Sequence, residues 1–176
     1  MLYEGGFMFE VGQYIVKANT GVCRVVDITM YSSSEDDEER ECYLLSPYSN
    51  EGARLFVPVE SDRTKMRPIM TQAEALSLLK RVPEIAAAVI VSDKLREQEY
   101  KDAIRSNDPE ALVRIIKNLN IRTREREEQG KKSTAVDERY LSMAETTLYS
   151  ELATALGKKM EEMRSMIAEM ADQWYL

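Results

Sequence analysis

Lysines and arginines concentrate between positions 94 and 132, and this is the segment best suited to bind phosphates. It carries 11 basic residues against 8 acidic ones, an excess of three, whereas the chain has a net charge of −7. Arg114, Lys117 and Arg124 are expected on the helical face opposite an apolar stripe, where they can meet successive phosphates. The candidate DNA-binding residues are Lys94, Arg96, Lys101, Arg114, Lys117, Arg122, Arg124, Lys131 and Lys132.

The alternative for this segment is an ordinary solvated helix surface. Several acids lie four residues from a base, as Glu128 does from Arg124, and such pairs are typical of exposed helices. The negative net charge also argues against binding nucleic acid by bulk charge alone. Any DNA contact must therefore come from a local patch.

Carboxylates could also do chemistry, and Glu74, Asp137 and Glu138 are the candidates for an enzyme of that kind. The chain has no histidine, which removes Ser-His and Cys-His catalysis and the commonest general base near neutral pH. The three acids fall at expected helix starts, where capping explains them, and no Gly-rich phosphate loop accompanies them. Cys23 and Cys42 are expected to be reduced, buried thiols. We therefore expect no enzyme, metal, cofactor or small-molecule substrate.

The elements that position these residues begin with short β-strands. Runs of β-branched and apolar residues predict strands over 13–17, 22–28, 41–45, 54–59 and 65–68. A tight turn over 18–21 is expected between the first two, because its Asn and Gly tolerate positive φ. Five short antiparallel strands at this spacing predict a small Tudor-like or SH3-like β-barrel over residues 8–70. Residues 1–7 show no pattern and are expected to be an extension.

A change of period at Thr71 begins a helical half, residues 71–176. Thr71-x-x-Glu74 matches a capping box, and Asp108-Pro109 places a cap residue before a proline at the first helical position. Further helices are predicted over 82–91 (a buried linker), 92–105, 109–130, 134–156 and 158–170. The fold class is therefore α+β, a β-barrel followed by an all-α bundle. No apolar run is long enough to span a membrane.

Five short motifs follow one another in a fixed order along the predicted strands. They are Phe9-x-Val11-Gly12, Gly21-Val22-x-x-Val25, Tyr43-Leu44-Leu45, Leu55-Phe56-Val57-Pro58-Val59 and Met66-Arg67-Pro68-Ile69. No single motif is specific, but in this order and spacing they make the chain resemble the CarD/CdnL family of bacterial transcription regulators. The resemblance extends into the helical half.

This resemblance implies a non-enzymatic regulator of transcription. In the family the barrel docks on the β subunit of RNA polymerase by pairing sheet edges, which by position assigns the contact here to Met30, Tyr31, Arg54, Leu55 and Phe56. The helical half is expected to contact promoter DNA at the upstream edge of the melted bubble and to modulate open-complex formation. The expected location is the cytoplasm, on the nucleoid.

One departure from the family pattern concerns the start of the helix near Ser92. Many relatives carry a tryptophan there that wedges into the minor groove, whereas this chain reads Val-Ile-Val-Ser-Asp over 89–93. Ile90 or Val91 could be a smaller wedge, yet both are expected in the core, and the only tryptophan, Trp174, is expected to be a packing or tail residue. This keeps open the alternative of a polymerase-bound adaptor without direct DNA contact. A second departure is that Tyr31 and Phe56 replace basic residues of some members.

Overall fold

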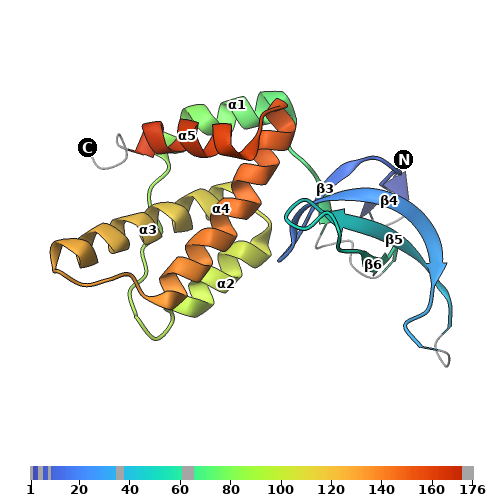
Figure 1. Ribbon diagram of the computed structural model, residues 1–176, viewed down its shortest axis with the longest axis horizontal. Coiled ribbons are helices and arrows are strands. Elements are labelled where there is room, and N and C mark those ends of the chain that lie inside the picture. Colours follow the sequence, from blue (N-terminus) through green and yellow to red (C-terminus); the bar gives the residue numbers. More distant parts are fainter. Residues whose placement is uncertain (1, 4–5, 8, 35–37, 61–65, 172–176) are drawn as a thin grey trace. The chain divides into compact units, whose positions relative to one another are not determined.

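The computed structural model of the 176-residue chain describes residues 2–3, 6–7, 9–34, 38–60 and 66–171. The chain divides into two compact units, Met1–Ile69 and Met70–Leu176. The first unit is built of strands and the second of helices (Figure 1). Trp174 lies outside the described residues.

The first unit contains a five-stranded antiparallel sheet. Its strands stand in the order β6-β5-β4-β3-β7 and are β3 (Tyr14–Lys17), β4 (Gly21–Tyr31), β5 (Arg40–Pro47), β6 (Leu55–Pro58) and β7 (Met66–Pro68). The five predicted antiparallel strands are therefore confirmed. Closure into a barrel is not, because among the described residues no pairing joins β6 to β7 and the sheet is open.

Local sequence explains how this sheet turns and bends. Asn19 and Gly21 both adopt positive φ, 64° and 84°, which reverses the chain between β3 and β4. The pairing of β4 with β5 shifts register between Val25 and Asp27, and such a bulge bends a strand and increases its twist. Two further short strands, β1 (Leu2–Tyr3) and β2 (Gly6–Phe7), pair with each other within the segment expected to be an extension.

The core of the first unit lies on one face of the sheet. Tyr43 is 1% exposed, and its hydroxyl accepts a hydrogen bond of 3.1 Å from the backbone N–H of Phe9, whose ring packs against it. The other buried members are Ile15, Cys23, Val25, Leu45, Val57 and Met66. Because side chains alternate along a strand, the residues between them point to the opposite, outer face.

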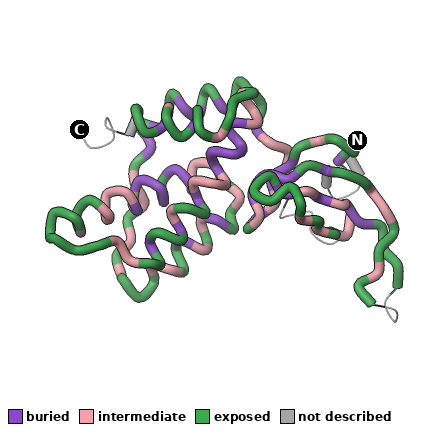
Figure 2. The backbone as a smooth tube through the Cα atoms, viewed as in Figure 1, coloured by how far each residue is buried: buried purple, intermediate pink, exposed green. Residues whose placement is uncertain are grey.

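The second unit is an all-α arrangement that packs around one apolar core. Its helices are α1 (Gln72–Arg81), the short 3-10 helix η2 (Val82–Glu84), α2 (Arg96–Ser106), α3 (Pro109–Glu128), α4 (Ala135–Leu156) and α5 (Met160–Ala171). The buried carboxylate of Glu151 on α4 accepts a 2.9 Å hydrogen bond from the backbone N–H of Met70, so the first residue of this unit is tied to α4. Figure 2 shows the buried residues concentrated between the helices.

The predicted helix boundaries are set by local caps. Thr71 and Glu74 form the expected capping box, and Asp108 caps α3 with Pro109 in its first turn. Gly157, in the left-handed conformation at φ 62°, ends α4. Within the residues that the structure describes, no helix combines the length and the apolar character needed to cross a membrane.

The prediction of a buried linker helix over 82–91 is wrong. Helical structure ends with η2 at Glu84, and the chain then continues without regular structure to the start of α2 at Arg96. Val89 and Val91 are 88% and 96% exposed, so the expectation that Val91 is a core residue is also wrong, whereas the partly buried Ile90 packs against the core. An apolar, β-branched run can follow an extended path when other elements satisfy its backbone groups.

Candidate functional site: an open sheet edge and a basic helical surface

Strand β6 is one of the two outer strands of the sheet, and no strand among the described residues pairs with its other side. The N–H of Val59 bonds to Glu41 on β5, and this register places Leu55 and Val57 in the hydrogen-bonded pairs with β5. The residue between them, Phe56, therefore directs its backbone N–H and C=O away from β5, toward the open edge. Pro58 has no N–H to offer. Within β6, the edge thus presents one donor and acceptor pair, at Phe56.

An aromatic stack lies on the outer face beside this edge. The rings of Tyr31 on β4 and Phe56 on β6 have centroids 3.8 Å apart and planes inclined by 8°. The two residues are 39% exposed each, so the stack also forms an apolar surface open to solvent. An accessible strand edge with a neighbouring aromatic surface suits the addition of a strand from another protein.

The stack crosses the position of Cys42. Tyr31 pairs with Arg40, two residues before Cys42 on β5, and Phe56 pairs with Leu44, two residues after it. All of these side chains point to the same outer face, yet Cys42 is only 2% exposed. Burial raises the pKa of its thiol above the ordinary value. Cys23 is buried in the core on the other face, and both cysteines are free thiols, as expected.

The other three residues assigned to docking do not join this surface. Met30 is 56% exposed but points to the face opposite Tyr31, and Leu55 packs against the core. The guanidinium of Arg54 donates to the carbonyl oxygens of Glu51 and Ala53 at 2.7 and 2.8 Å, so this side chain holds the turn before β6. Of the five predicted residues, the structure brings together Tyr31 and Phe56.

The basic residues predicted to contact DNA fall into different environments. Lys117 was expected on the exposed face of α3, and that expectation is wrong, because the residue is 6% exposed. Its Nζ donates to the carbonyl oxygens of Val82 and Ile85 at 2.6 and 2.7 Å. The segment after α1 covers this side of the helix and thereby buries a face that the helical period alone assigns to solvent. Burial lowers the pKa of Lys117.

Arg122 and Arg96 belong to an ion-pair network. Arg122 Nε donates to the buried carboxylate of Asp137 at 2.9 Å, and the hydroxyl of Tyr100 donates to the same carboxylate at 3.1 Å. Burial by itself raises the pKa of Asp137, but these hydrogen bonds outweigh it and hold the pKa below the ordinary value. Arg96 donates to Asp93 at 2.7 and 2.9 Å, and Arg122 lies 3.7 Å from the same Asp93. Arg122 therefore has a structural role, and the guanidinium of Arg96 is held by Asp93.

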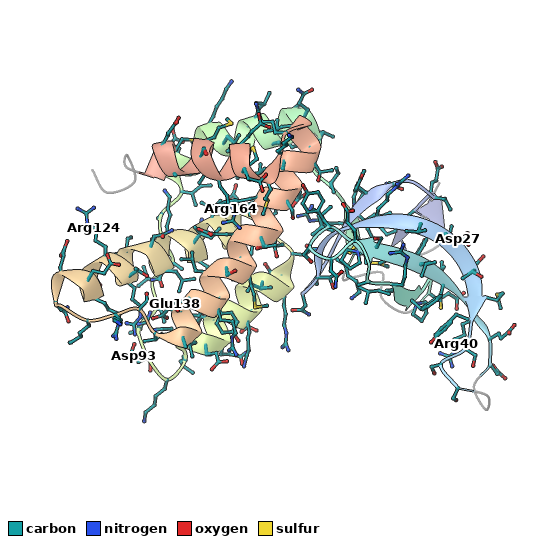
Figure 3. All side chains as sticks on the ribbon, viewed as in Figure 1. Asp27, Arg40, Asp93, Arg124, Glu138 and Arg164 are labelled. Carbon is teal, nitrogen blue, oxygen red and sulfur yellow. The ribbon has the colours of Figure 1, made fainter. Side chains whose placement is uncertain are left out.

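The remaining predicted bases lie closer to solvent. Lys101 and Arg124 are in helical ion pairs with Glu97 at 3.2 Å and Glu128 at 3.4 Å, and Figure 3 shows Arg124 projecting from α3. Further exposed bases of the segment 94–132 are Lys94, Arg105, Arg114, Lys131 and Lys132. Arg105 was absent from the predicted set, although its place on α2 within the basic segment was visible in the sequence.

Of the three carboxylates considered for catalysis, two have structural roles and one is exposed. Glu74 completes the capping box with Thr71, and Asp137 belongs to the Arg122 network. Glu138 lies exposed in the first turn of α4. In the part of the chain that the structure describes, no three histidine, cysteine, aspartate or glutamate residues are grouped so as to hold a metal ion.

Comparison with known protein families gives one further observation about this surface. The family model of the CarD-like/TRCF RID domain matches residues 9–70. This range contains all five strands of the larger sheet, including the edge at β6 and the Tyr31–Phe56 stack, and it ends before α1. No curated protein matches the chain.

Proposed function

Residues 9–70 belong to the CarD-like/TRCF RID family of RNA polymerase-interacting domains, and from this premise we propose a transcription regulator with two contacts. The sheet docks on the β subunit of RNA polymerase through β6, and the helical unit contacts promoter DNA at the upstream edge of the melted bubble. The protein performs no catalysis and works in the cytoplasm, on the nucleoid.

The open edge at Phe56 is the observation that carries the docking half. A polymerase strand that bonds to the Phe56 N–H and C=O extends the sheet, and the exposed Tyr31–Phe56 stack adds an apolar contact next to that strand. Buried aromatic residues often dominate the binding energy of an interface. Because Arg54 is turned to its own loop, backbone pairing and aromatic burial are the main sources of affinity.

The exposed bases support the DNA half. The basic segment exposes the cations Lys94, Arg105 and Arg114 to solvent. The apolar side chain of Val91 is exposed as well, so both kinds of side chain are available to a DNA duplex. Such a protein changes promoter opening by binding the open complex more tightly than the closed one. This is a population shift, which needs no chemical step.

The alternative is an adaptor that binds polymerase without touching DNA. It is favoured by the structural use of Arg96, Lys117 and Arg122, which removes three of the predicted phosphate contacts. Measuring binding to promoter-like duplexes at several salt concentrations separates the two functions, because phosphate contacts weaken steeply with salt.

The docking half is tested with an immobilised β-subunit lobe of the host polymerase. Phe56→Ala removes the ring and is expected to weaken binding by about tenfold or more. Phe56→Pro removes the ring and also the outward N–H; because that N–H makes no ladder bond to β5, proline is tolerated at this edge. Tyr14→Ala, an exposed aromatic on β3, is the matched control.

The outcomes separate the two contributions. Weaker binding by Phe56→Pro than by Phe56→Ala supports strand pairing. Unchanged binding by Tyr14→Ala supports the location of the binding site at the β6 edge. If the two Phe56 variants bind equally well, the ring is the contact and the strand-pairing hypothesis is wrong. If folded wild-type protein fails to bind the lobe, docking through this edge is overturned.

A further inference from the structure

Residues 85–95, here named the strap, connect η2 to α2 without regular secondary structure. Backbone groups in such a segment need partners from elsewhere in the protein or from water. Much of the bonding of the strap comes from a single helix, α3. It is attached there at three successive places.

The first attachment is made by Lys117. Its ammonium group lies within hydrogen-bonding distance of the carbonyl oxygens of Val82 and Ile85, at 2.6 and 2.7 Å, and of Pro83 at 3.4 Å. A charged group that is 94% buried persists only where hydrogen bonds replace its hydration. Lys117 therefore fixes the point at which the strap leaves η2.

The second attachment is at Ala88, and the third is at Asp93. The Ala88 carbonyl accepts from the side-chain amide of Asn118 at 2.8 Å, and its N–H donates to the carbonyl of Arg114 at 3.0 Å. Asp93 lies 3.7 Å from Arg122, which is itself held by Asp137. Figure 3 shows Asp93 near the lower end of this unit, beside the strap's turn into α2.

The attachment points share one side of α3, since 114, 118 and 122 are spaced by four residues and 117 adjoins them. Between the second and third points the strap alternates its side chains as an extended chain does. Ile90 packs against the core, whereas Val89 and Val91 are 88% and 96% exposed. The strap is therefore an apolar element that is bonded to α3 on one side and exposed to solvent on the other.

We propose that Lys117, Asn118 and Arg122 form a clamp that presents the strap as a preformed contact element for DNA. Lys117 is then a positioning residue and contacts no phosphate. This inference rests on the proposed DNA contact of the helical unit. Preorganisation matters here because an ordered loop loses less conformational entropy on binding than a loose one.

The clamp is tested first in the absence of DNA. Lys117→Met keeps the apolar stem and removes the ammonium group. Asn118→Ala removes the side-chain bond of the second attachment and leaves the backbone bond between Ala88 and Arg114 in place. Circular dichroism and a cooperative melting curve first establish that both variants are folded. Each is then expected to exchange the Ala88 amide hydrogen about tenfold faster than the wild type, or more. Arg114→Ala removes an exposed charge from the same helix and is expected to leave this exchange rate unchanged.

The same variants are then titrated with duplex DNA carrying a short melted bubble, at several salt concentrations. Lys117→Met is expected to bind about tenfold more weakly with an unchanged salt slope, whereas Arg114→Ala should reduce the slope by about one. A reduced slope for Lys117→Met would make Lys117 a phosphate contact and overturn the clamp's role in presentation.

The remaining outcomes decide between this inference and the proposed function. If the Ala88 amide exchanges at the wild-type rate in both clamp variants, the clamp is overturned, whatever the DNA affinity of these variants. If exchange is faster but the variants bind DNA as tightly as the wild type, the strap is not the contact element. The proposed DNA binding by the helical unit is then unaffected. Absence of DNA binding by the wild type overturns the DNA half of the proposed function, and the contact role of the strap with it.

Discussion

The rings of Tyr31 and Phe56 stack in parallel, with centroids 3.8 Å apart, across the strand that carries Cys42. The two residues come from strands on either side of β5, so the stack links three strands on the outer face. The same pair thus contributes an apolar surface, lies across the strand of a buried thiol and adjoins the edge of the sheet.

Removing one ring of this stack is expected to uncover Cys42. In Phe56→Ala, the thiol should react faster with a thiol-labelling reagent in the native state, because access increases and the burial that raises its pKa is relieved. The loss of the aromatic pair should also cost about 1 kcal/mol of unfolding free energy. Labelling of Cys42, followed by peptide mass spectrometry, measures the first effect.

Two internal references make this measurement specific. Cys23, which is 0% exposed in the core, should keep its slow labelling rate. Met30→Ala, an exposed apolar residue on the opposite face, should leave Cys42 protected. An unchanged Cys42 rate in Phe56→Ala would show that the stack is not what covers the thiol.

Asp137→Asn is expected to destabilise the helical unit by about 2 kcal/mol at neutral pH, because Arg122 then lacks its buried anionic partner. The ordinary pKa of an aspartate is about 3.9. The folded-state pKa of Asp137 lies below that value. Its ionised form therefore stabilises the fold above that ordinary value, and this contribution disappears as the pH falls through the folded-state pKa.

The pH dependence of urea unfolding measures this effect. The difference in unfolding free energy between wild type and Asp137→Asn should shrink between pH 7 and about pH 3. Glu138→Gln, at the neighbouring exposed position, is the control and should show no comparable gap. A gap of constant size across this range would mean that the charge of Asp137 is not the stabilising feature.

Neighbouring bases should differ in their contribution to DNA binding. Lys94 is exposed, so Lys94→Ala should lower the slope of log K against log salt by about one. The side chain of Arg96 is 15% exposed and bonded to Asp93, so Arg96→Ala should leave that slope unchanged. Fluorescence anisotropy at several salt concentrations gives both slopes. Equal reductions would place Arg96 on the phosphate-contacting surface as well.

The cap of α3 should be a measurable source of stability. The Asp108 carboxylate accepts a 3.0 Å hydrogen bond from the backbone N–H of Glu110, so Asp108→Ala should lower the unfolding free energy by about 1 kcal/mol. Asp108→Asn keeps the acceptor and should cost much less. Urea unfolding of the three proteins decides this, and equal stability of the alanine and asparagine variants would contradict it.

Local signals in the sequence predicted much of the fold. Thr71, Asp108 and Gly157 act on residues within a few positions of themselves, so their caps could be identified without any tertiary contact. The five strands were likewise recognisable from alternation and turn residues, and the resemblance to the CarD-like family is confirmed over residues 9–70.

The failures involve contacts between distant parts of the chain. Lys117 is buried because a segment about thirty residues earlier folds over α3, and helical period alone gives no sign of that cover. Val91 is apolar yet exposed, because the strap is bonded to α3 at Ala88 and then runs extended, with Ile90 against the core and Val91 on the other side. The stacking of Tyr31 on Phe56 depends on the register of three strands and on the bulge after Val25.

An edge that accepts a foreign strand also invites copies of the same protein, which is how cross-β aggregates grow. Here Pro58 ends β6 with a residue that has no N–H, and β6 has only four residues. The outward N–H of Phe56 is a single donor within this strand, so β6 gives a growing fibril no continuous ladder. The edge can therefore remain exposed in the unbound protein with little tendency to self-assemble.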